Sequence, residues 1–444
     1  MTRSPRLARN VRQVTGALGA VAFVICMMSG CTPEPENTST TEIVRVPGDA
    51  PTITEAIDQV APGGLVLVSP GVYEEEVTID KEGITLRGVD RNDTVIDGGG
   101  LRSFGVFVSA DGVRVQNLTV RSAQFYGVLV TGMHDENGPL AHGGPGYSSL
   151  DTDAFPPIER FAVEGVTASN NGLYGIYAFD ARHGVIADSY ASGSADSGFY
   201  VGQCEECDIL VSGNVAERNA IGFENANASD SVYIVGNRFA GNRIGMTLIS
   251  NYQEAFTPQR KNRVFGNVIS GNHSSDSPAH ALGGFGVGLA VNGGVGNDIA
   301  ANRIEGNPVA GILLSNAEDL PAKDNVFSDI AFATNGVDVV NTSADRAPAL
   351  GNCFTLSGPA TFSPESLSGS RCGDTAPTAG GGVLPRVDVP SGISFLKVPQ
   401  PPAQPSMTDV ETLPSPLPDT ITMPAAADFP LPAADFLADR AGVR

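Results

Sequence analysis

The sequence predicts an all-β fold, a right-handed parallel β-helix with about 23 residues per coil and an N-terminal capping helix. The first observation is a set of short apolar segments that each open with glycine, at Gly175, Gly198, Gly222, Gly245, Gly288, Gly311 and Gly336. Their spacings are 23, 24, 23, 43, 23 and 25 residues, where 43 is one coil plus 20 inserted residues. The second is a column of asparagines with a similar period, at Asn214, Asn237, Asn267, Asn302 and Asn325. Four of these have another asparagine five positions later, at Asn219, Asn242, Asn272 and Asn307.

A coil of this length accommodates three short strands and three turns. Each strand then pairs with its equivalent on the next coil, about 4.8 Å away. Val, Ile, Leu and Phe at inward positions stack into a continuous core. Asparagine amides can bond along such a stack, and asparagine tolerates the left-handed backbone of a sharp corner. We therefore expect the asparagines to be corner residues rather than ligands, and about ten coils between residues 42 and 350.

The first coil requires a cover, because an open coil exposes unpaired strand edges. Residues 52–60 predict a short amphipathic helix with Ile53, Ala56, Ile57 and Val60 on one face. This helix follows a predicted strand at 43–47 and precedes the apolar segment that starts at Gly64. We expect it to be the N-terminal cap.

The N-terminus is typical of a targeting signal. Four arginines at positions 3, 6, 9 and 12 precede a short apolar run over residues 14–28. The following Met28-Ser29-Gly30-Cys31 resembles a bacterial lipobox, which implies a signal peptide over 1–30, lipidation at Cys31 and a polar tether over 31–41. The predicted location is the outer face of a bacterial cell membrane, with the lipid as the anchor. An ordinary signal peptide that is cleaved elsewhere is the alternative.

The β-helix domain is expected over residues 42–372, followed by a proline-rich tail over 373–444. This tail holds 13 of the 31 prolines and no repeat. Its composition favours an extended or disordered chain. Apolar segments such as 393–396 offer the alternative that the tail packs along the β-helix.

Four cysteines remain after the predicted signal peptide and lipid site: Cys204, Cys207, Cys353 and Cys372. An extracytoplasmic address permits disulfides. We expect one between Cys353 and Cys372. The pair Cys204 and Cys207 predicts either a local disulfide or free thiols, because the sequence around it does not complete a zinc site.

The chain has 49 acidic and 27 basic residues, a net charge of −22. This charge argues against nucleic acid as a partner, because phosphates require a surface rich in Lys and Arg.

Residues 46–88 (VPGDAPTITEAIDQVAPGGLVLVSPGVYEEEVTIDKEGITLRG) resemble the opening of pectate-lyase-like parallel β-helix proteins. The later coils resemble the NosD-like and carbohydrate-binding branch of that superfamily. The resemblance covers about residues 42–372 and implies the fold. It leaves the activity open, because relatives include lyases, hydrolases and epimerases as well as proteins without a known reaction.

Strand alternation predicts a binding surface for sugars. The second residue after each leading glycine should point outward, which stacks Tyr177, Tyr200 and Glu224 on adjacent coils. Gln203 and Asn227 lie at the ends of the same strands, as does Asp180. Aromatic rings suit the apolar face of a sugar, and carboxylates and amides suit its hydroxyls. The predicted ligand-binding residues are Tyr177, Tyr200, Glu224, Gln203 and Asn227. Ordinary decoration of an exposed sheet is the alternative.

Three insertions, at about 132–157, 251–261 and 273–284, carry four of the five histidines. The first two follow the same strand of the coil and should project on the same side as walls of a groove. A uronate lyase needs a base and a cation that neutralises the sugar carboxylate, either Ca²⁺ or arginine. By location, the catalytic candidates are Asp180, Arg182, Glu224, His134, His142 and Arg260. The catalytic motifs of alginate epimerases and polygalacturonases are absent from the sequence, so metal ligands and enzymatic activity stay open.

The function that the sequence favours is that of an envelope-anchored extracytoplasmic lipoprotein that binds a polysaccharide or a cell-envelope glycan. One alternative is a lyase or epimerase that acts on a uronate-containing glycan. A second alternative, implied by the NosD-like resemblance, is a periplasmic accessory protein.

Overall fold

The computed structural model describes residues 41–140, 149–378 and 380–443. The predicted signal peptide, the lipidation site at Cys31 and the candidate His142 lie outside these residues, so they stay predictions. In the described part of the chain, no helix is both long enough and apolar enough to cross a membrane.

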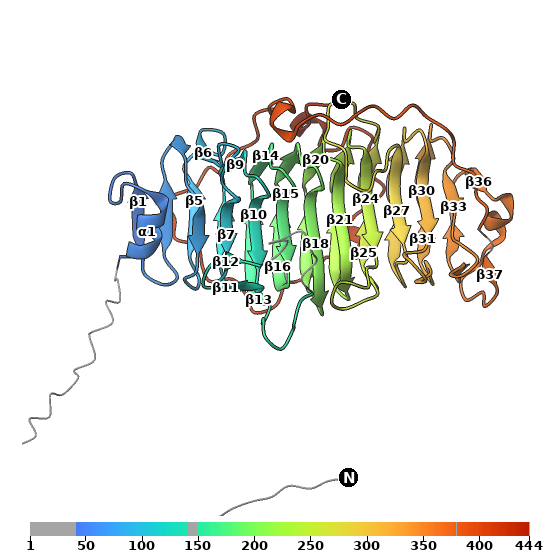
Figure 1. Cartoon of the computed structure of the whole chain (residues 1–444), viewed down its shortest axis with the longest axis horizontal. Helices are drawn as coiled ribbons and strands as arrows, with labels where there is room; N and C mark the ends of the chain where they lie inside the picture. The colour runs from blue at the N-terminus through green and yellow to red at the C-terminus, as the bar shows by residue number, and fades with distance from the viewer. Residues whose placement is uncertain (1–40, 141–148, 379, 444) are drawn as a thin grey trace, which may run out of the picture. The chain divides into compact units, whose positions relative to one another are not determined.

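Three long parallel sheets form the structure (Figure 1). We call them sheets A, B and C. Sheet A contains β1 (Ile43–Val46), β2 (Leu65–Val68), β5 (Thr85–Gly88), β8 (Arg114–Gln116), β13 (Ile158–Glu164), β16 (Ala181–Ala187), β19 (Ile209–Ser212), β22 (Val232–Val235), β25 (Arg263–Phe265), β28 (Asp298–Ala300), β31 (Val326–Ser328) and β35 (Cys353–Thr355).

Sheet B contains β3 (Gly71–Tyr73), β6 (Thr94–Asp97), β9 (Thr119–Arg121), β14 (Thr167–Ser169), β17 (Tyr190–Ser192), β20 (Val215–Glu217), β23 (Arg238–Ala240), β26 (Val268–Ser270), β29 (Arg303–Glu305) and β32 (Ala331–Ala333). Sheet C contains β4 (Val77–Ile79), β7 (Phe104–Val108), β10 (Tyr126–Thr131), β15 (Tyr174–Phe179), β18 (Ser197–Glu205), β21 (Ile221–Ser229), β24 (Ile244–Ile249), β27 (Val287–Asn292), β30 (Ala310–Ser315), β33 (Val339–Asn341) and β36 (Phe362–Ser363).

Each full coil runs through one strand of sheet A, one of sheet B and one of sheet C. The ten strands of sheet B, from β3 to β32, each lie between a strand of sheet A and a strand of sheet C along the chain. The predicted fold, with about ten coils, is confirmed. Inward side chains stack in register: Ile176 pairs with Phe199, which pairs with Phe223, and Met246, Leu289 and Ile312 continue the stack. All of these side chains are fully buried.

The leading glycines lie in sheet C and are required by close backbone contact. A Cβ atom on Gly175 would lie 2.5 Å from the carbonyl oxygen of Gly198 on the next coil. The predicted column holds from Gly175 to Gly311 but is wrong at Gly336. Because Ile312 pairs with Val339, the residue equivalent to Gly311 is Asp338.

The asparagines form hydrogen-bonded ladders at the corners of the coil. In one ladder the amide oxygens of Asn237, Asn267 and Asn302 accept from the backbone N–H of Asn214, Asn237 and Asn267, respectively. A second ladder joins Asn219, Asn242, Asn272, Asn307 and Asn335 in the same manner. Asn325 belongs to neither, which corrects its predicted place. It lies in a third ladder, with Asn262, Asn297 and Asn352.

The asparagines of the first ladder are expected to have the left-handed backbone of the corner, but the residue before each of them has it instead. Gly213, Gly236, Gly266 and Ala301 have φ between +51° and +66°. These residues directly precede Asn214, Asn237, Asn267 and Asn302. Asparagine therefore supplies the side-chain ladder, while the preceding residue makes the sharp turn.

The N-terminal cap is helix α1 (Ile53–Gln59). The Thr52 hydroxyl accepts a hydrogen bond from the backbone N–H of Glu55, which satisfies a free donor at the helix start. Ile53, Ala56, Ile57 and Val60 are buried, as their spacing predicts.

Shorter elements complete the chain. Strands β11 (His134–Asp135) and β12 (Gly138–Pro139) form a small hairpin, and β34 (Ala349–Leu350) pairs with β37 (Pro377–Thr378). The 3-10 turns are η1 (Glu365–Gly369), η2 (Phe395–Lys397), η3 (Ala426–Asp428) and η4 (Ala438–Arg440). Disulfides join Cys204 to Cys207 and Cys353 to Cys372.

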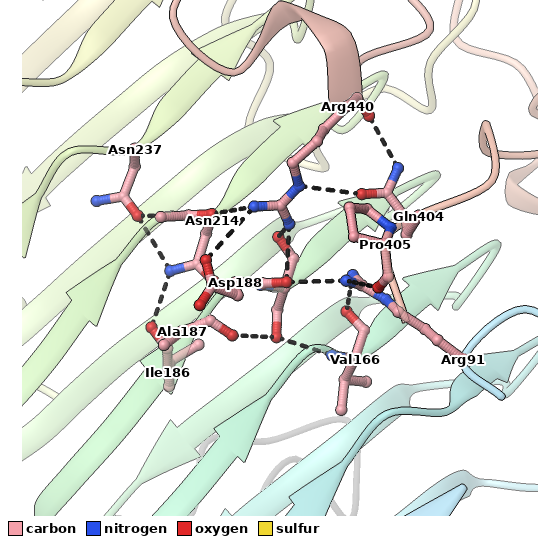
Figure 2. A network of polar contacts seen from close by, with 12 residues as sticks. Arg91, Val166, Ile186, Ala187, Asp188, Asn214, Asn237, Gln404, Pro405 and Arg440 are labelled. Atoms are coloured by element: carbon pink, nitrogen blue, oxygen red, sulfur yellow. Dashed lines mark hydrogen bonds and ion pairs between the residues drawn. The ribbon is translucent and has the colours of Figure 1, made fainter. Parts of the chain in front are cut away.

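The tail from residue 380 to 443 lies on the β-helix as an extended chain with three 3-10 turns. Arginines of the coils donate to its backbone carbonyls. Arg87 donates to Val410 and Thr412, Arg114 donates to Ser415, and Arg303 donates to Pro432. Figure 2 shows the return contact, where Arg440 of the tail reaches the backbone between sheets A and B.

Candidate functional site

Two insertions leave the coils where sheet C turns into sheet A. The first follows β10 and includes the β11–β12 hairpin, and the second connects β24 to β25. Their common origin places both beside the strands that carry the predicted tyrosines. The third insertion, between β26 and β27, leaves from the corner between sheets B and C.

The predicted tyrosine column has the expected register and direction. Tyr177 pairs with Tyr200, which pairs with Glu224. The two tyrosines belong to an apolar cluster that is separate from the interior of the coils, so they point outward. Their rings stack with a centroid distance of 4.2 Å.

The prediction of an accessible platform is wrong, because insertions cover these rings. Tyr177 and Tyr200 are 1% and 2% exposed. Apolar side chains from both insertions pack on the cluster: Leu140, Leu150, Phe155, Ala255 and Phe256. The tyrosines therefore form a second core beneath the insertions, not an open sugar-binding surface.

Glu224 continues the column at the edge of this second core and is partly buried. Burial, followed by the negative charges of Asp196 and Glu254, raises the pKa of its carboxyl well above the usual value. Asp196 accepts a hydrogen bond of 2.9 Å from the hydroxyl of Tyr174. The Nε2 atom of His280 lies 3.6 Å from the same carboxylate oxygen.

Gln203 and Asn227 hold the second insertion rather than face solvent. The Gln203 side-chain oxygen accepts from the backbone N–H of Ala255. The Asn227 amide donates to the carbonyl of Asn251 and to the hydroxyl of Thr257. Both side chains are buried. Because their polar atoms bind this loop, their predicted role as ligand-binding residues does not fit the structure.

Asp180 occupies the position equivalent to Gln203 one coil earlier and has a different environment. Its side chain is 2% exposed, and its Oδ2 atom has no hydrogen-bond partner among the residues that the structure describes. Burial raises the pKa of the carboxyl to about 7, although the positive charge of Arg182 lowers it in part. A Cβ atom on Gly132 would lie 2.7 Å from this oxygen, so glycine there leaves room beside the carboxyl.

Asp180 lines a cavity of about 260 Å³, which we call the Asp180 pocket. The disulfide-bonded strand end and both insertions contribute to its walls, which consist of Thr152, Pro157, Arg182, Cys204, Glu205, Glu206 and Phe256. A second hollow of about 650 Å³ shares Pro157 and Arg182 with it and also contains His134 and Glu159. We call the two together the corner site.

A chain of charged groups holds the corner site in place. Arg182 donates to one Glu159 oxygen at 2.7 Å, and the Nδ1 atom of His183 lies 2.6 Å from the other oxygen. Burial by itself would raise the pKa of Glu159, but the hydrogen bonds from His183 and Arg182 outweigh it, so the pKa is lowered. The Nε2 atom of His183 lies 3.4 Å from Asp208.

The structure thus brings three of the predicted catalytic candidates together: Asp180, Arg182 and His134. Arg260 forms an ion pair of 2.8 Å with Glu205, which lines the Asp180 pocket. Glu224 lies in the tyrosine column, next to Tyr200, and His142 lies outside the described residues. Sequence reasoning missed Glu159, although it precedes Arg182 by 23 residues, one coil, and pairs with it in sheet A.

The residues that the structure describes do not provide a metal site. Among them, no group of three or more His, Cys, Asp or Glu side chains could hold a metal ion. All four cysteines of the described residues form disulfides, Cys204 with Cys207 and Cys353 with Cys372, and leave no thiolate there for copper. A copper centre therefore does not fit these donors.

The family model described as "Periplasmic copper-binding protein (NosD)" matches residues 67–280. A comparison with curated protein sequences gives no significant match.

Solved structures with a similar chain path are remote in sequence. The pectate lyase Pel9A has 16% identity and a TM-score of 0.40, with 73% of this chain and 82% of that chain covered. The A-module of the mannuronan C-5 epimerase AlgE4 from Azotobacter vinelandii has 15% identity and a TM-score of 0.36, covering 67% and 91%. The Dettilon tailspike protein has 12% identity and a TM-score of 0.41, covering 74% and 70%. At this level of similarity the matches do not assign an activity to this chain.

Proposed function

This chain is a right-handed parallel β-helix protein, and we propose that it is an extracytoplasmic protein that binds a polysaccharide or cell-envelope glycan at the corner site. One observation supports the proposal most directly. The Asp180 pocket contains a buried carboxyl oxygen without a hydrogen-bond partner among the described residues. Leaving such an atom unpaired is costly, and a sugar hydroxyl is a suitable donor for it.

The size and chemistry of the corner site agree with this ligand. The Asp180 pocket, at about 260 Å³, suits one small polar unit, and the adjoining hollow of about 650 Å³ provides space for a neighbouring unit. Carboxylates, a guanidinium and an imidazole line the two spaces. These groups donate and accept hydrogen bonds, as sugar hydroxyls require.

Calorimetric titration of the protein with neutral and uronate oligosaccharides tests the proposal. Asp180→Asn keeps the shape of the side chain and the tolerance for a left-handed backbone, so folding should be preserved. At pH 8, where the carboxyl is ionised, we expect this variant to bind the best ligand at least tenfold more weakly, because a buried hydrogen bond to a charged acceptor contributes about 1.5–3 kcal/mol. Asp135→Asn, an exposed change in the first insertion, is the matched control. Equal affinity of wild type and Asp180→Asn would refute the proposed site.

A second candidate function is a lyase or epimerase reaction on a uronate-containing glycan. The observation in its favour is the raised pKa of Asp180, about 7, which suits a group that transfers protons near neutral pH. A lyase would remove the proton beside the sugar carboxyl and form a carbon–carbon double bond that absorbs ultraviolet light. An epimerase would exchange that proton with solvent deuterium without cleavage. Assays with uronate polymers, with and without Ca²⁺, distinguish both reactions from binding alone.

A further inference from the structure

A separate hollow lies over the outer face of sheet B, above β23, β26 and β29. Its volume is about 800 Å³, within the range of roughly 300–1,000 Å³ that is usual for small-molecule sites. It shares no lining residue with the corner site. We call it the sheet B trough.

Small residues form the floor of the trough. Ala240 pairs with Ser270, which pairs with Glu305 on the next coil. Phe239 and Ile269 belong to the buried core, so their neighbours Ala240 and Ser270 face outward. Gly241, Gly271 and Gly306 follow these strands and also line the trough. A ligand can therefore approach the backbone of adjacent coils.

Two segments from distant parts of the sequence contribute the walls. Residues 273–276 of the third insertion line the trough, and so do Ala434, Gly442 and Val443 of the tail. The tail end is fixed to sheet B, because the backbone N–H groups of Gly442 and Val443 donate to the Glu217 carboxylate at 2.9 and 2.8 Å.

Arg440 fastens the tail next to this wall (Figure 2). Its guanidinium donates to the carbonyl oxygens of Gly213 and Asp188, each at 2.7 Å, and Gln404 accepts from its Nε atom. Arg91 donates to the same Asp188 carbonyl from the other side. Because Arg440 is 7% exposed, the wall is anchored by a buried contact rather than by a surface one.

Arg238 is the charged residue that joins floor and wall. It is 6% exposed and donates to the tail carbonyls of Ala434 and Phe436. Its Nε atom has no hydrogen-bond partner within the described ranges, and the residue lines the trough. This buried donor is independent of the small-residue floor and indicates a polar ligand.

The other lining groups define the chemistry of that ligand. Two guanidinium groups, Arg218 and Arg238, and two carboxylates, Asp276 and Glu305, line the trough. Hydroxyls of Ser270, Ser274 and Thr334 lie among them. Guanidinium groups and carboxylates are equal in number, the imidazole of His273 is also present, and the described lining residues include no Phe or Tyr. This combination suits an uncharged group with many hydroxyls better than an anion or an apolar chain.

We propose that the sheet B trough is a second carbohydrate-binding site, that it takes a neutral oligosaccharide, and that the C-terminal tail completes it. The proposal does not depend on the corner site, because the two spaces lie on different faces of the coil. A chain with both sites could hold two glycan segments at once.

The absence of tryptophan from the sequence provides a direct test. Ser275→Trp, at an exposed wall position, introduces a single fluorescent reporter into the full-length protein. Leu282→Trp, at a 90% exposed position of the same insertion outside the trough lining, is the matched control. Each variant is titrated with tetrasaccharides of glucose, mannose and N-acetylglucosamine and with tetragalacturonate.

We expect at least one neutral tetrasaccharide to give a saturable emission change with Ser275→Trp and none with Leu282→Trp. Tetragalacturonate should bind at least tenfold more weakly than that neutral sugar. In the reporter background, Ser270→Leu should weaken binding at least tenfold by filling the floor, with the melting temperature as a check on folding. Asp180→Asn should leave the titration unchanged.

Three results would overturn the proposal. The first is the absence of a saturable change with all three neutral sugars. The second is equal binding by the Ser270→Leu variant. The third is loss of the signal in Asp180→Asn, which would place the binding at the corner site instead. Conversely, if wild type and Asp180→Asn bound oligosaccharides equally well in the calorimetric titration, the corner site would be refuted and the trough proposal would stand.

Discussion

Asp180 is a buried carboxyl whose ionisation opposes folding. Burial raises its pKa to about 7 in the folded protein, whereas an unfolded aspartate titrates near 3.9. The native state therefore keeps the proton to higher pH than the unfolded state. The contribution of the protonated Asp180 carboxyl to the stability of the folded protein is complete below about pH 3.9. It declines as the pH rises towards about 7 and is lost above that pH.

Asp180→Asn removes this penalty, because the amide does not ionise. Relative to wild type, we expect the free energy of unfolding to rise by about 2–4 kcal/mol at pH 8 and to change little at pH 4. Urea unfolding at both pH values measures the difference. The exposed Asp135→Asn should show no such dependence on pH. A stability difference that is the same at pH 4 and pH 8 would show that Asp180 titrates normally.

Tyr200 illustrates the limit of alternation at the residue scale. The period-two pattern correctly predicts that its side chain leaves the coil interior, yet it cannot say whether solvent or another segment lies outside. Apolar residues in the insertions, such as Leu150 and Phe155, were the available signal. Because the ring is buried, Tyr200→Ala should destabilise the protein by about 3–5 kcal/mol. Tyr252→Ala, at a 49% exposed position, should cost less than about 1 kcal/mol in the same denaturant titration. A similar cost for both would argue against the second core.

At the scale of the elements, the asparagine ladders connect successive coils. Asn237 donates through its amide to the Val211 carbonyl and to the Asn267 side chain, and its own oxygen accepts from Asn214. Asn237→Ala would leave several buried groups unpaired. Since each such group costs about 1–3 kcal/mol, we expect a loss of at least roughly 3 kcal/mol in chemical unfolding. The exposed Asn137→Ala serves as the comparison and should change stability by less than about 0.5 kcal/mol. A loss below about 1 kcal/mol at Asn237 would contradict a structural role for the ladder.

The period of the coil could be predicted from the sequence because equivalent residues face identical neighbours on each coil. The wrong assignment of Asn325 arises because two corners of the coil both use asparagine. Asn325 follows Asn302 by 23 residues, one coil length, yet the two lie in different ladders. A longer connection between β30 and β31 shifts the next coil, which also explains the error at Gly336. Spacing alone cannot distinguish the equivalent residue on the next coil from another residue that an insertion brings to the same spacing.

At the scale of the whole molecule, the tail was the least predictable part, and composition left its two arrangements open. Its prolines remove backbone donors, so its carbonyl oxygens become the main points of attachment. Most partners of these carbonyls are arginines dispersed over coils that are far apart in the sequence, including Arg87, Arg238 and Arg303, and Asn92 and Asn170 also donate to the tail. Such contacts have no local sequence signature, because each arginine also suits an ordinary exposed strand position.

Arg440 should control whether the tail stays on the coils. Its guanidinium donates to the carbonyl oxygens of Gly213 and Asp188, which lie at the corner between sheets A and B on two adjacent coils (Figure 2). In Arg440→Ala, the Gly213 carbonyl and the Gln404 side-chain oxygen lose this donor, whereas the Asp188 carbonyl still accepts from Arg91. The tail end then loses its anchor beside Glu217. We expect amide hydrogen exchange over residues 434–443 to become at least tenfold faster, while exchange in the strands of sheets A, B and C stays unchanged. Arg386→Ala, an exposed tail position, is the control and should leave exchange in both regions at the wild-type rate. If Arg440→Ala protected the tail end as well as the wild type does, the Glu217 contacts would hold it without the arginine. If it accelerated exchange across all coils, Arg440 would support the β-helix itself rather than the attachment of the tail.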